Sequence, residues 1–306
     1  MTTIDRMTPP HVPAWLAETF ATGSIDRAVR LGWGFRNETW QVDLTDGRRL
    51  AVTCPADSLA APAVVALTLV IGPRLRAAGI PSPRIVDLAA GDASTVFATA
   101  FATEFVEGTS GAEMLALDDG PALIGALLGD AWRRLRSIDP AGLPLPDAWA
   151  APRGLADLSR ARLSRAEGWL TRQEQQLAAA AIGALPELLA GRRPGFVHGD
   201  FVPVNMLVRD GSLAAILDFE FVRLAEPLLD AAWFDQIVAF HHPGEEPAAW
   251  QAFVSAAGID ADDPRTGHLL RTLPLVRLLE ILDGDRRSER VAHWLPILRS
   301  CIARMA

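Results

Sequence analysis

Short runs with β-strand character, separated by turns, fill the first third of the chain. Residues 28–44 contain two such runs around a Gly-containing turn, and 45–54 add an Asp-Gly hairpin turn and a third run. Residues 60–78 are rich in Ala, Leu and Val and predict a helix that stops near Gly79. Residues 83–105 resemble another pair of strands joined by a turn. This part of the chain is therefore expected to be β-rich, with one helix.

Long helical patterns replace the strand-like runs beyond residue 110. These patterns cover residues 121–138, 155–190, 227–240, 246–257, 266–282 and 289–304. Strand-like material in this part is short and consists of 206–209 and 213–217, joined by Asp-Gly. The Pro-rich segment 139–154 is expected to be a surface loop.

The two patterns predict an α+β protein with two lobes. The small lobe, residues 1–104, would carry an antiparallel β-sheet and one helix, and the larger lobe, residues 111–306, would be mainly helical. Residues 105–110 are rich in Gly and small side chains and are expected to form a hinge. A chain of 306 residues is long enough for two such parts.

Composition narrows the classes of function. The net charge of −8 argues against a nucleic-acid partner, which would favour a basic face. Neither a signal peptide nor an apolar run of membrane-spanning length is evident, and two cysteines suit a reducing compartment, so a cytoplasmic protein is expected. A monomer or a homodimer is expected. All 29 basic residues counted as Lys+Arg are arginine, so functions that need a lysine are excluded.

The stretch FVHGDFVPVNMLV, residues 196–208, places polar residues at fixed spacing between apolar ones. Asn205 follows Asp200 just before one predicted strand, and Asp218 follows the return strand of the same hairpin. Because a hairpin brings its ends together, Asn205 and Asp218 can reach one point. Carboxylate and amide oxygens suit Mg²⁺, and Asp200 is left nearby as a base that could orient a hydroxyl. This arrangement suits phosphoryl transfer.

Simpler interpretations compete with this one. A single Asp or Asn after a strand is usually a turn former. The set of His198, Asp200, Asn205 and Asp218 at this spacing is much harder to explain as turn residues alone. Within the set, His198 is expected to be structural, with its ring hydrogen-bonded to the loop backbone. A metal-dependent hydrolase would need further histidines, for which His241 and its neighbour are the weak candidates.

The pattern H-G-D-x-x-x-x-N followed by I-L-D-F-E resembles the signature of the aminoglycoside phosphotransferase and choline kinase family, which has a protein-kinase-like fold. The resemblance runs over most of the chain. It also includes GFRNETWQV at 34–42, AAGIPSPRIVDL at 77–88, TEFVEG at 103–108 and EPLLDAAWF at 226–234. The C-terminal motifs are specific, whereas the N-terminal ones are weak when taken alone.

The resemblance implies a role for each matching residue. Asp200 would be the catalytic base, and Asn205 and Asp218 would hold Mg²⁺. Asp230 matches a buried acidic position that stabilises the catalytic loop, although a carboxylate favoured by a helix N-terminus explains it equally well. The remaining positions would bind the nucleotide, through backbone groups at the hinge and through the loop over the phosphates: Glu104, Val106, Gly34, Arg36 and Asn37.

The chain departs from the family where a basic residue on the third strand should grip the phosphates. That position falls on Thr53, and the Glu that would pair with it falls near Thr68. Loss of both partners leaves no unpaired charge. Arg36 could supply the missing positive charge, although a solvated loop arginine is the simpler interpretation. The departure also favours an alternative function, a pseudokinase or nucleotide-binding regulator.

Acidic residues in the C-terminal part would attract an amine-bearing acceptor. The acidic candidates, which ordinary solvated charges would explain as well, are Glu220, Glu280 and Asp283, and His241 is a further candidate in a loop on the substrate side. The overall prediction is an O-phosphotransferase that moves the γ-phosphoryl group of Mg²⁺-ATP or Mg²⁺-GTP to a hydroxyl of an amine- or sugar-containing natural product. Antibiotic resistance is one role that such an enzyme would serve.

Overall fold

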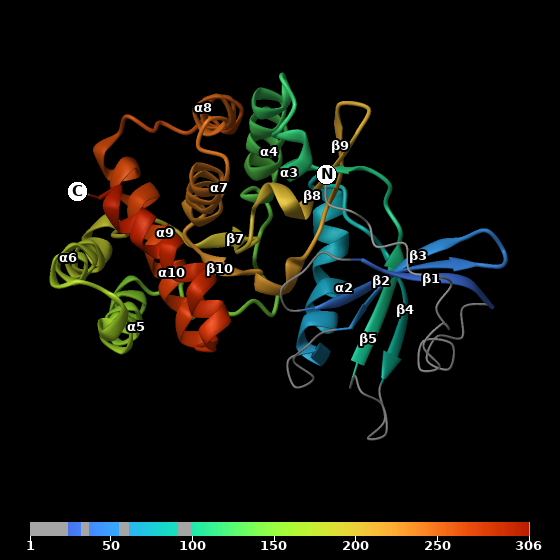
Figure 1. The fold of residues 1–306 in the computed structure, drawn as a ribbon, viewed down its shortest axis with the longest axis horizontal. Coiled ribbons are helices and arrows are strands. Elements are labelled where there is room, and N and C mark those ends of the chain that lie inside the picture. Colours follow the sequence, from blue (N-terminus) through green and yellow to red (C-terminus); the bar gives the residue numbers. More distant parts are fainter. Residues whose placement is uncertain (1–23, 32–36, 55–60, 91–98, 306) are drawn as a thin grey trace. The chain divides into compact units, whose positions relative to one another are not determined.

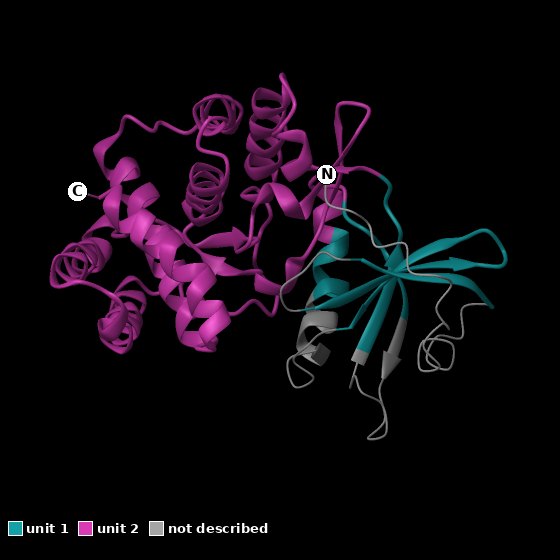
Figure 2. Ribbon diagram, in the orientation of Figure 1, with its two compact units in different colours: residues 1–73, 82–107 teal, residues 74–81, 108–306 magenta. Residues whose placement is uncertain are grey.

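The computed structural model describes residues 24–31, 37–54, 61–90 and 99–305. The chain divides into two compact units, residues 1–73 with 82–107 and residues 74–81 with 108–306 (Figure 2). The short segment 74–81 groups with the helical unit, and the first unit extends to Glu107. No helix in the described part of the chain is long and apolar enough to span a membrane.

An antiparallel sheet forms the first unit (Figure 1). Its strand order among the described residues is β1-β2-β3-β5-β4. The strands are β1 (Ile25–Leu31), β2 (Glu38–Leu44), β3 (Arg49–Cys54), β4 (Ile85–Ala90) and β5 (Thr99–Glu104). Alternate residues such as Val42, Leu50 and Val52 turn inward, as the two-residue period of a strand requires. The helix α2 (Ala61–Ala77) follows β3, where the sequence predicted it.

Helices make up most of the second unit (Figure 1). They are α3 (Gly111–Met114), α4 (Gly120–Leu135), α5 (Pro152–Arg165), α6 (Arg172–Leu188), α7 (Leu228–His241), α8 (Glu246–Ala257), α9 (Pro264–Gly284) and α10 (Ser288–Ala303). Helix α9 is almost entirely buried along its middle and packs against α5, α6, α7 and α10. The core of this unit therefore lies around α9.

Three predictions for this unit were wrong in detail. Strands at 195–197 and 223–225 were not expected, because the sequence analysis confined strand-like material to 206–209 and 213–217. The helical pattern over 155–190 is divided into α5 and α6, because Thr171 and Glu174 form a capping box that starts a new helix. The surface loop predicted over 139–154 ends early: α5 begins at Pro152, and Trp149 is buried. A proline in the first helical turn favours that start.

Short strands carry the polar motif. β7 (Gly195–Val197) pairs with β10 (Arg223–Ala225), and β8 (Met206–Arg209) pairs with β9 (Ser212–Ile216) and with β6 (Thr109–Ser110). The β8–β9 hairpin, with its Asp-Gly turn, lies where the sequence predicted it. Both strand pairs are antiparallel, so the residues that follow β7 and β9 are held at fixed positions within this unit.

Candidate active site

The loop after β7 is clamped by Asp230 in the first turn of α7. Each oxygen of this buried carboxylate accepts one backbone N–H, from His198 and from Gly199, both at 2.8 Å. Burial raises the pKa of Asp230 to about 7, against the opposing effect of the two N–H donors. The clamp fixes the backbone that leads to Asp200.

His198 is fully buried and is bonded to the backbone on both sides of its ring. Nε2 lies 2.9 Å from the carbonyl oxygen of Leu217, and Nδ1 accepts the backbone N–H of Asp200 at 3.2 Å. A ring that accepts at Nδ1 and faces a carbonyl at Nε2 must be neutral with its proton on Nε2. Burial lowers the pKa of His198 to about 4, which agrees with this form. Both ring nitrogens therefore hold the backbone of the loop in place through hydrogen bonds.

Gly199 is required by geometry. Its φ of +81° lies in the left-handed region, which side chains disfavour. A Cβ added at this position would lie 2.2 Å from the carbonyl oxygen of Phe221. The backbone after Asp218 therefore passes directly against the loop, and only glycine fits between them.

The half-buried carboxylate of Asp200 accepts hydrogen bonds at both oxygens. The indole Nε1 of Trp233 donates to Oδ1 at 2.8 Å, and Nδ2 of Asn205 donates to Oδ2 at 3.0 Å. Nδ2 of Asn205 also bonds the backbone carbonyl of Asp200 at 3.0 Å. Two donors to one carboxylate restrict its rotation. The side chain is thus held in a fixed position as a hydrogen-bond acceptor.

The sequence analysis did not place Trp233 at the site and missed its bond to Asp200. A signal was available, because Trp233 lies three residues after Asp230 on α7 and residues three apart share one face of a helix. A buried indole N–H also needs an acceptor. The two facts together place a donor beside the loop that Asp230 clamps.

The β8–β9 hairpin brings Asn205 beside the segment that carries Asp218. The backbone N–H of Leu217 donates to the carbonyl oxygen of Asn205 at 2.8 Å, and Met206 pairs with Ile216. Asp218 is exposed and has φ +61° and ψ +65°, a left-handed conformation that is uncommon for a residue with a side chain. Such an outlier often marks a functional position.

These residues fit a magnesium ion that is completed by phosphate oxygens. The amide nitrogen of Asn205 faces Asp200, which leaves its oxygen as the free ligand atom, and Asp218 offers an exposed carboxylate. Within the described ranges, no group of three or more His, Cys, Asp or Glu could hold a metal by protein ligands alone. A pair of hard oxygen ligands plus phosphates is the arrangement that Mg²⁺ uses in nucleotide sites.

The predicted nucleotide-binding residues that the structure describes belong to the first unit and lie on its strands or next to them. Thr53 lies on β3 opposite Thr39 of β2 and Phe101 of β5. Glu104 ends β5, and its carboxylate pairs with Arg84 at 3.0 Å. Asn37 directly precedes β2, and Val106 follows β5, both half-buried; Gly34 and Arg36 lie outside the described residues.

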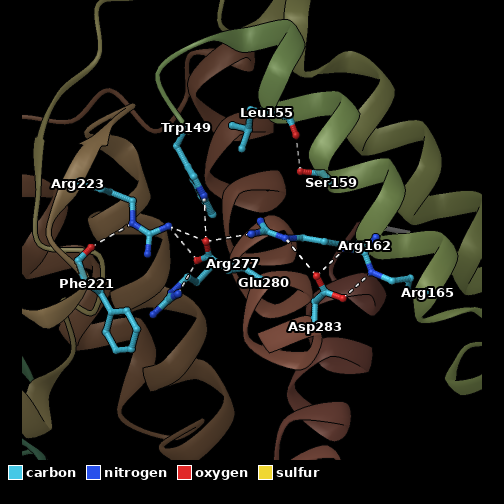
Figure 3. Close-up of polar contacts among 10 residues, drawn as sticks. All are labelled: Trp149, Leu155, Ser159, Arg162, Arg165, Phe221, Arg223, Arg277, Glu280 and Asp283. Carbon is cyan, nitrogen blue, oxygen red and sulfur yellow. Dashed lines mark hydrogen bonds and ion pairs between the residues drawn. The ribbon is translucent and has the colours of Figure 1, made fainter. Parts of the chain in front are cut away.

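The predicted acceptor-binding residues have different surroundings. The ring of His241 stacks near His293, with centroids 6.3 Å apart, and Glu220 lies in the short turn after Asp218. Asp283 is bridged by both donors of Arg165 at 2.6 Å. Glu280 is surrounded by Arg162, Arg223 and Arg277 (Figure 3). Burial alone would raise the pKa of Glu280, but these arginines outweigh it and lower the pKa to about 2.

The sequence analysis expected Glu280 and Asp283 to be carboxylates that can bind an amine of the acceptor. Their contacts differ from this expectation. Their oxygens are already bonded to guanidinium groups of the same unit. An ammonium group would have to displace arginines that are held in bidentate or multiple contacts. The predicted role of these two residues in binding an amine has no support in these contacts.

Both cysteines are buried, and neither is arranged as a nucleophile. Burial raises the pKa of Cys54 and of Cys301 to about 12, so both stay as thiols at neutral pH. Each acts as a small apolar side chain in its core.

Comparison with known proteins adds a family and a fold. A family model described as "Phosphotransferase enzyme family" matches residues 27–270. No curated protein matches the sequence. Among solved structures, the GDP complex of wild-type aminoglycoside 2'-phosphotransferase-IIIa is 16% identical with a TM-score of 0.75, over 95% of this chain and 96% of that one.

Two further structures have the same architecture. A ternary complex of aminoglycoside phosphotransferase APH(4)-Ia with ADP and hygromycin B is 14% identical, with a TM-score of 0.67, over 96% of this chain and 98% of that one. The macrolide 2'-phosphotransferase MphH from Brachybacterium faecium, an apoenzyme, is 16% identical, with a TM-score of 0.61, over 89% and 91%. At these identities the similarity shows the fold, and it confirms the predicted two-part, kinase-like α+β architecture.

Proposed function

Since the chain belongs to the phosphotransferase enzyme family, we propose that it moves the γ-phosphoryl group of Mg²⁺-ATP or Mg²⁺-GTP to a small molecule. As a member it is a kinase whose acceptor is a hydroxyl group. The acceptor is an amine- or sugar-containing natural product, and antibiotic inactivation is one role of such a reaction. The solved enzymes of the same fold include complexes with GDP and kanamycin and with ADP and hygromycin B.

The observation that carries the proposal is the fixed carboxylate of Asp200 beside the hairpin with Asn205 and Asp218. Asp200 accepts bonds from Trp233 and Asn205, and Asn205 is bonded to Leu217, the residue before Asp218. A base and two metal ligands are thereby held by one connected set of backbone and side-chain bonds. Phosphoryl transfer depends on this kind of positioning more than on covalent chemistry.

Each residue has a defined role in the proposed reaction. Asp200 accepts the proton of the acceptor hydroxyl and orients its oxygen toward the γ-phosphorus. Asn205 and Asp218 would hold Mg²⁺, which would supply positive charge to neutralise the phosphate oxygens. His198 and Asp230 keep the loop in shape through their backbone bonds. The hydroxyl proton therefore has an acceptor whose position is fixed before the substrate binds.

The donor nucleotide is proposed to bind the first unit. Backbone groups of Glu104 and Val106 would bond the purine, and the segment with Gly34, Arg36 and Asn37 would cover the phosphates. Thr53 stands where related folds use a basic residue, and the chain has no lysine at all. Positive charge for the phosphates must therefore come from Mg²⁺ and arginine.

This absence supports the alternative function, a nucleotide-binding regulator without catalysis. Calorimetry separates the two possibilities. Titration of ATP and of GTP, each with and without Mg²⁺, is compared between wild type and D218N, followed by a search for phosphorylated acceptors. We expect Mg²⁺-dependent binding that is at least tenfold weaker in D218N. Turnover that D200N abolishes while nucleotide binding persists supports the kinase.

Other outcomes count against the proposal in different ways. Nucleotide binding without Mg²⁺ dependence, and without any turnover, would favour the regulator. A folded protein that binds neither nucleotide would contradict both functions.

A further inference from the structure

Glu280 of α9 lies at the centre of an arginine cluster, defined here as Arg162, Arg223, Arg277 and Glu280 (Figure 3). Arg223 Nη1 bonds both oxygens of Glu280, at 2.9 and 2.8 Å, and Arg277 Nη1 bonds Oε2 at 2.5 Å. Arg162 Nη2 approaches Oε1 at 3.2 Å. The cluster joins α5, β10 and α9, three elements distant in sequence.

The positive charge of this cluster exceeds its negative charge. Three guanidinium groups face one carboxylate, and the nearby Asp283 is already paired with Arg165, lying 3.9 Å from Arg162 Nε. The surplus is largely shielded from water: Arg277 is 3% exposed and Arg223 is 8% exposed. Buried charges are normally paired, because losing water around an unpaired ion is costly. A second anion would balance the cluster.

Some donor atoms of the cluster lack a hydrogen-bond partner. Arg277 Nε, and Nε and Nη1 of Arg162, are buried and have no hydrogen-bond partner among the described residues. Guanidinium N–H groups match the oxygens of a carboxylate or phosphate.

The cluster is adjacent to the catalytic loop within the same unit. Arg223 pairs with Val197 in the β10–β7 ladder, and its Nε donates to the carbonyl oxygen of Phe221 at 3.0 Å. That same oxygen crowds Gly199, the residue before Asp200. The aromatic ring of Phe221 lies 4.2 Å from the Arg277 guanidinium. Arg223 is therefore connected through the backbone of Phe221 and Gly199 to the loop that carries Asp200.

We propose that the arginine cluster binds an oxyanion, a carboxylate or phosphate, of the acceptor molecule. The acceptor would then be a hydroxylated anion, in place of the amine-rich acceptor that the acidic residues of the sequence suggested. The inference rests on the proposed function, because it assigns the charge of the acceptor for the same reaction. Glu280 holds the guanidinium groups in position, and the surplus charge is the binding determinant.

A purely structural network is the competing explanation, and it makes opposite predictions for Glu280. If the cluster only stabilises the fold, E280Q lowers stability and creates no affinity for anions beyond that of wild type. If the cluster binds an anion, E280Q removes a competing negative charge and strengthens anion binding. This variant also avoids the problem that arginine variants in a buried site can unfold.

Inorganic phosphate is the probe, titrated by calorimetry into the full chain. We expect one phosphate per chain, a Kd at least tenfold weaker in R223Q and in R277Q, and a Kd at least threefold tighter in E280Q. R209Q, which removes an exposed arginine at the end of β8, is the matched control and leaves the Kd unchanged. R162Q, at the rim of the cluster, serves if R223Q or R277Q is unfolded by circular dichroism.

Absence of phosphate binding by folded wild type, or equal binding by all arginine variants, overturns the proposal. Competition with D-glucose, D-glucosamine, D-glucuronate and D-glucose 6-phosphate then identifies the source of the anion. Displacement of phosphate by glucuronate indicates a carboxylate, and displacement by glucose 6-phosphate indicates a phosphate. Displacement by glucosamine, or by neither anion, contradicts the assignment to the acceptor.

Nucleotide binding on the same samples keeps the two proposals separate. Phosphate binding at the arginine cluster without any binding of Mg²⁺-nucleotide would leave the anion site and reject the kinase function. Nucleotide binding with turnover, but without arginine-dependent phosphate binding, would support the kinase function and reject the anion site.

Discussion

At the scale of single residues, the site depends on donors that fix one carboxylate. Asp200 accepts from Trp233 at one oxygen and from Asn205 at the other, and His198 accepts its backbone N–H. Neither Trp233 nor His198 needs to touch the acceptor or the nucleotide. Their effect is to hold the carboxylate in one rotamer before substrate arrives, which is how positioning lowers an activation barrier.

The indole of Trp233 offers a direct test of this positioning. W233F keeps most of the buried volume and removes the N–H. A hydrogen bond to a charged group contributes about 1.5–3 kcal/mol, so kcat should fall roughly 10- to 100-fold if the whole bond acts in the transition state. The KM for nucleotide should change little. Initial rates of phosphoryl transfer check this.

The control for this variant is W250F on α8, where Trp250 stacks on Phe253. W250F should retain the wild-type kcat. A W233F enzyme as active as wild type would show that the bond to Asp200 is only structural.

His198 should remain neutral well below its ordinary pKa. Its native pKa is lowered to about 4 by burial, whereas an unfolded histidine titrates near 6.5. Between these values the unfolded state binds more protons, so the contribution of His198 to stability falls as pH drops from about 6.5 to about 4. Asp230 acts in the opposite sense, since its raised pKa stabilises the folded state as pH falls from about 7 toward 3.8.

Because these two groups oppose each other, a measurement specific to His198 is needed. Long-range ¹H–¹⁵N spectra of histidine-labelled protein should show a neutral ring with Nε2 protonated from pH 7 to pH 5. The signal is assigned by its loss in H198Q. Protonation of both nitrogens with a midpoint near 6.5 would contradict the buried, backbone-bonded ring.

At the scale of elements, close packing between helices is set by glycines. A Cβ on Gly125 of α4 would lie 2.0 Å from the carbonyl oxygen of Ala249 of α8, and one on Gly129 would lie 2.4 Å from that of Phe253. The two helices approach backbone to backbone at these points. This packing holds α8, and Phe253 of α8 stacks on Phe234 of the helix that carries Trp233 and Asp230.

Alanine substitutions in two helices should therefore have opposite effects. G129A forces α4 and α8 apart and should lower the free energy of unfolding by about 1–3 kcal/mol, as overpacking does. G183A in α6, where an added Cβ meets nothing within 4 Å, should raise it by roughly 0.5–1 kcal/mol through helix propensity. Urea unfolding of both variants measures the difference. A stabilised G129A would contradict the close approach.

At the scale of the whole molecule, composition restricts how phosphates can be bound. The chain has no lysine, so guanidinium groups are the permanent side-chain cations available. The net charge of −8 makes local arginine groups, such as the arginine cluster, stand out against an acidic background. An anionic substrate is attracted only where such groups gather.

Chemical modification tests this restriction on the intact protein. Treatment with an amine-directed acylating reagent should add one group, at the N-terminal amine, and leave Mg²⁺-nucleotide binding unchanged. Treatment with phenylglyoxal, which modifies arginine, should weaken binding at least tenfold, and nucleotide should protect against it. Mass spectrometry and calorimetry report both effects. Loss of binding after acylation would show that the amine contributes the missing charge.

Much of the fold followed from local pattern. Two-residue alternation, Asp-Gly turns and helical periodicity are short-range properties, so they predicted the β-rich part, α2, the β8–β9 hairpin and most helices. The capping box at Thr171 was equally local and was overlooked, which is why 155–190 appeared continuous. The motif with Asp200, Asn205 and Asp218 was visible because its spacing lies within one hairpin.

By itself the sequence determined the family, the candidate base and metal ligands, and the absence of lysine, because these depend on residue identity and short spacing. Only the tertiary structure decided which side chains meet across distant elements. Trp233 reaches Asp200 from 33 residues away, and Arg162 reaches Glu280 from 118 residues away. The ion-pair partner of a charged side chain is determined only when the chain folds. For that reason Glu280 suggested an amine site in the sequence and became the centre of an arginine cluster in the structure.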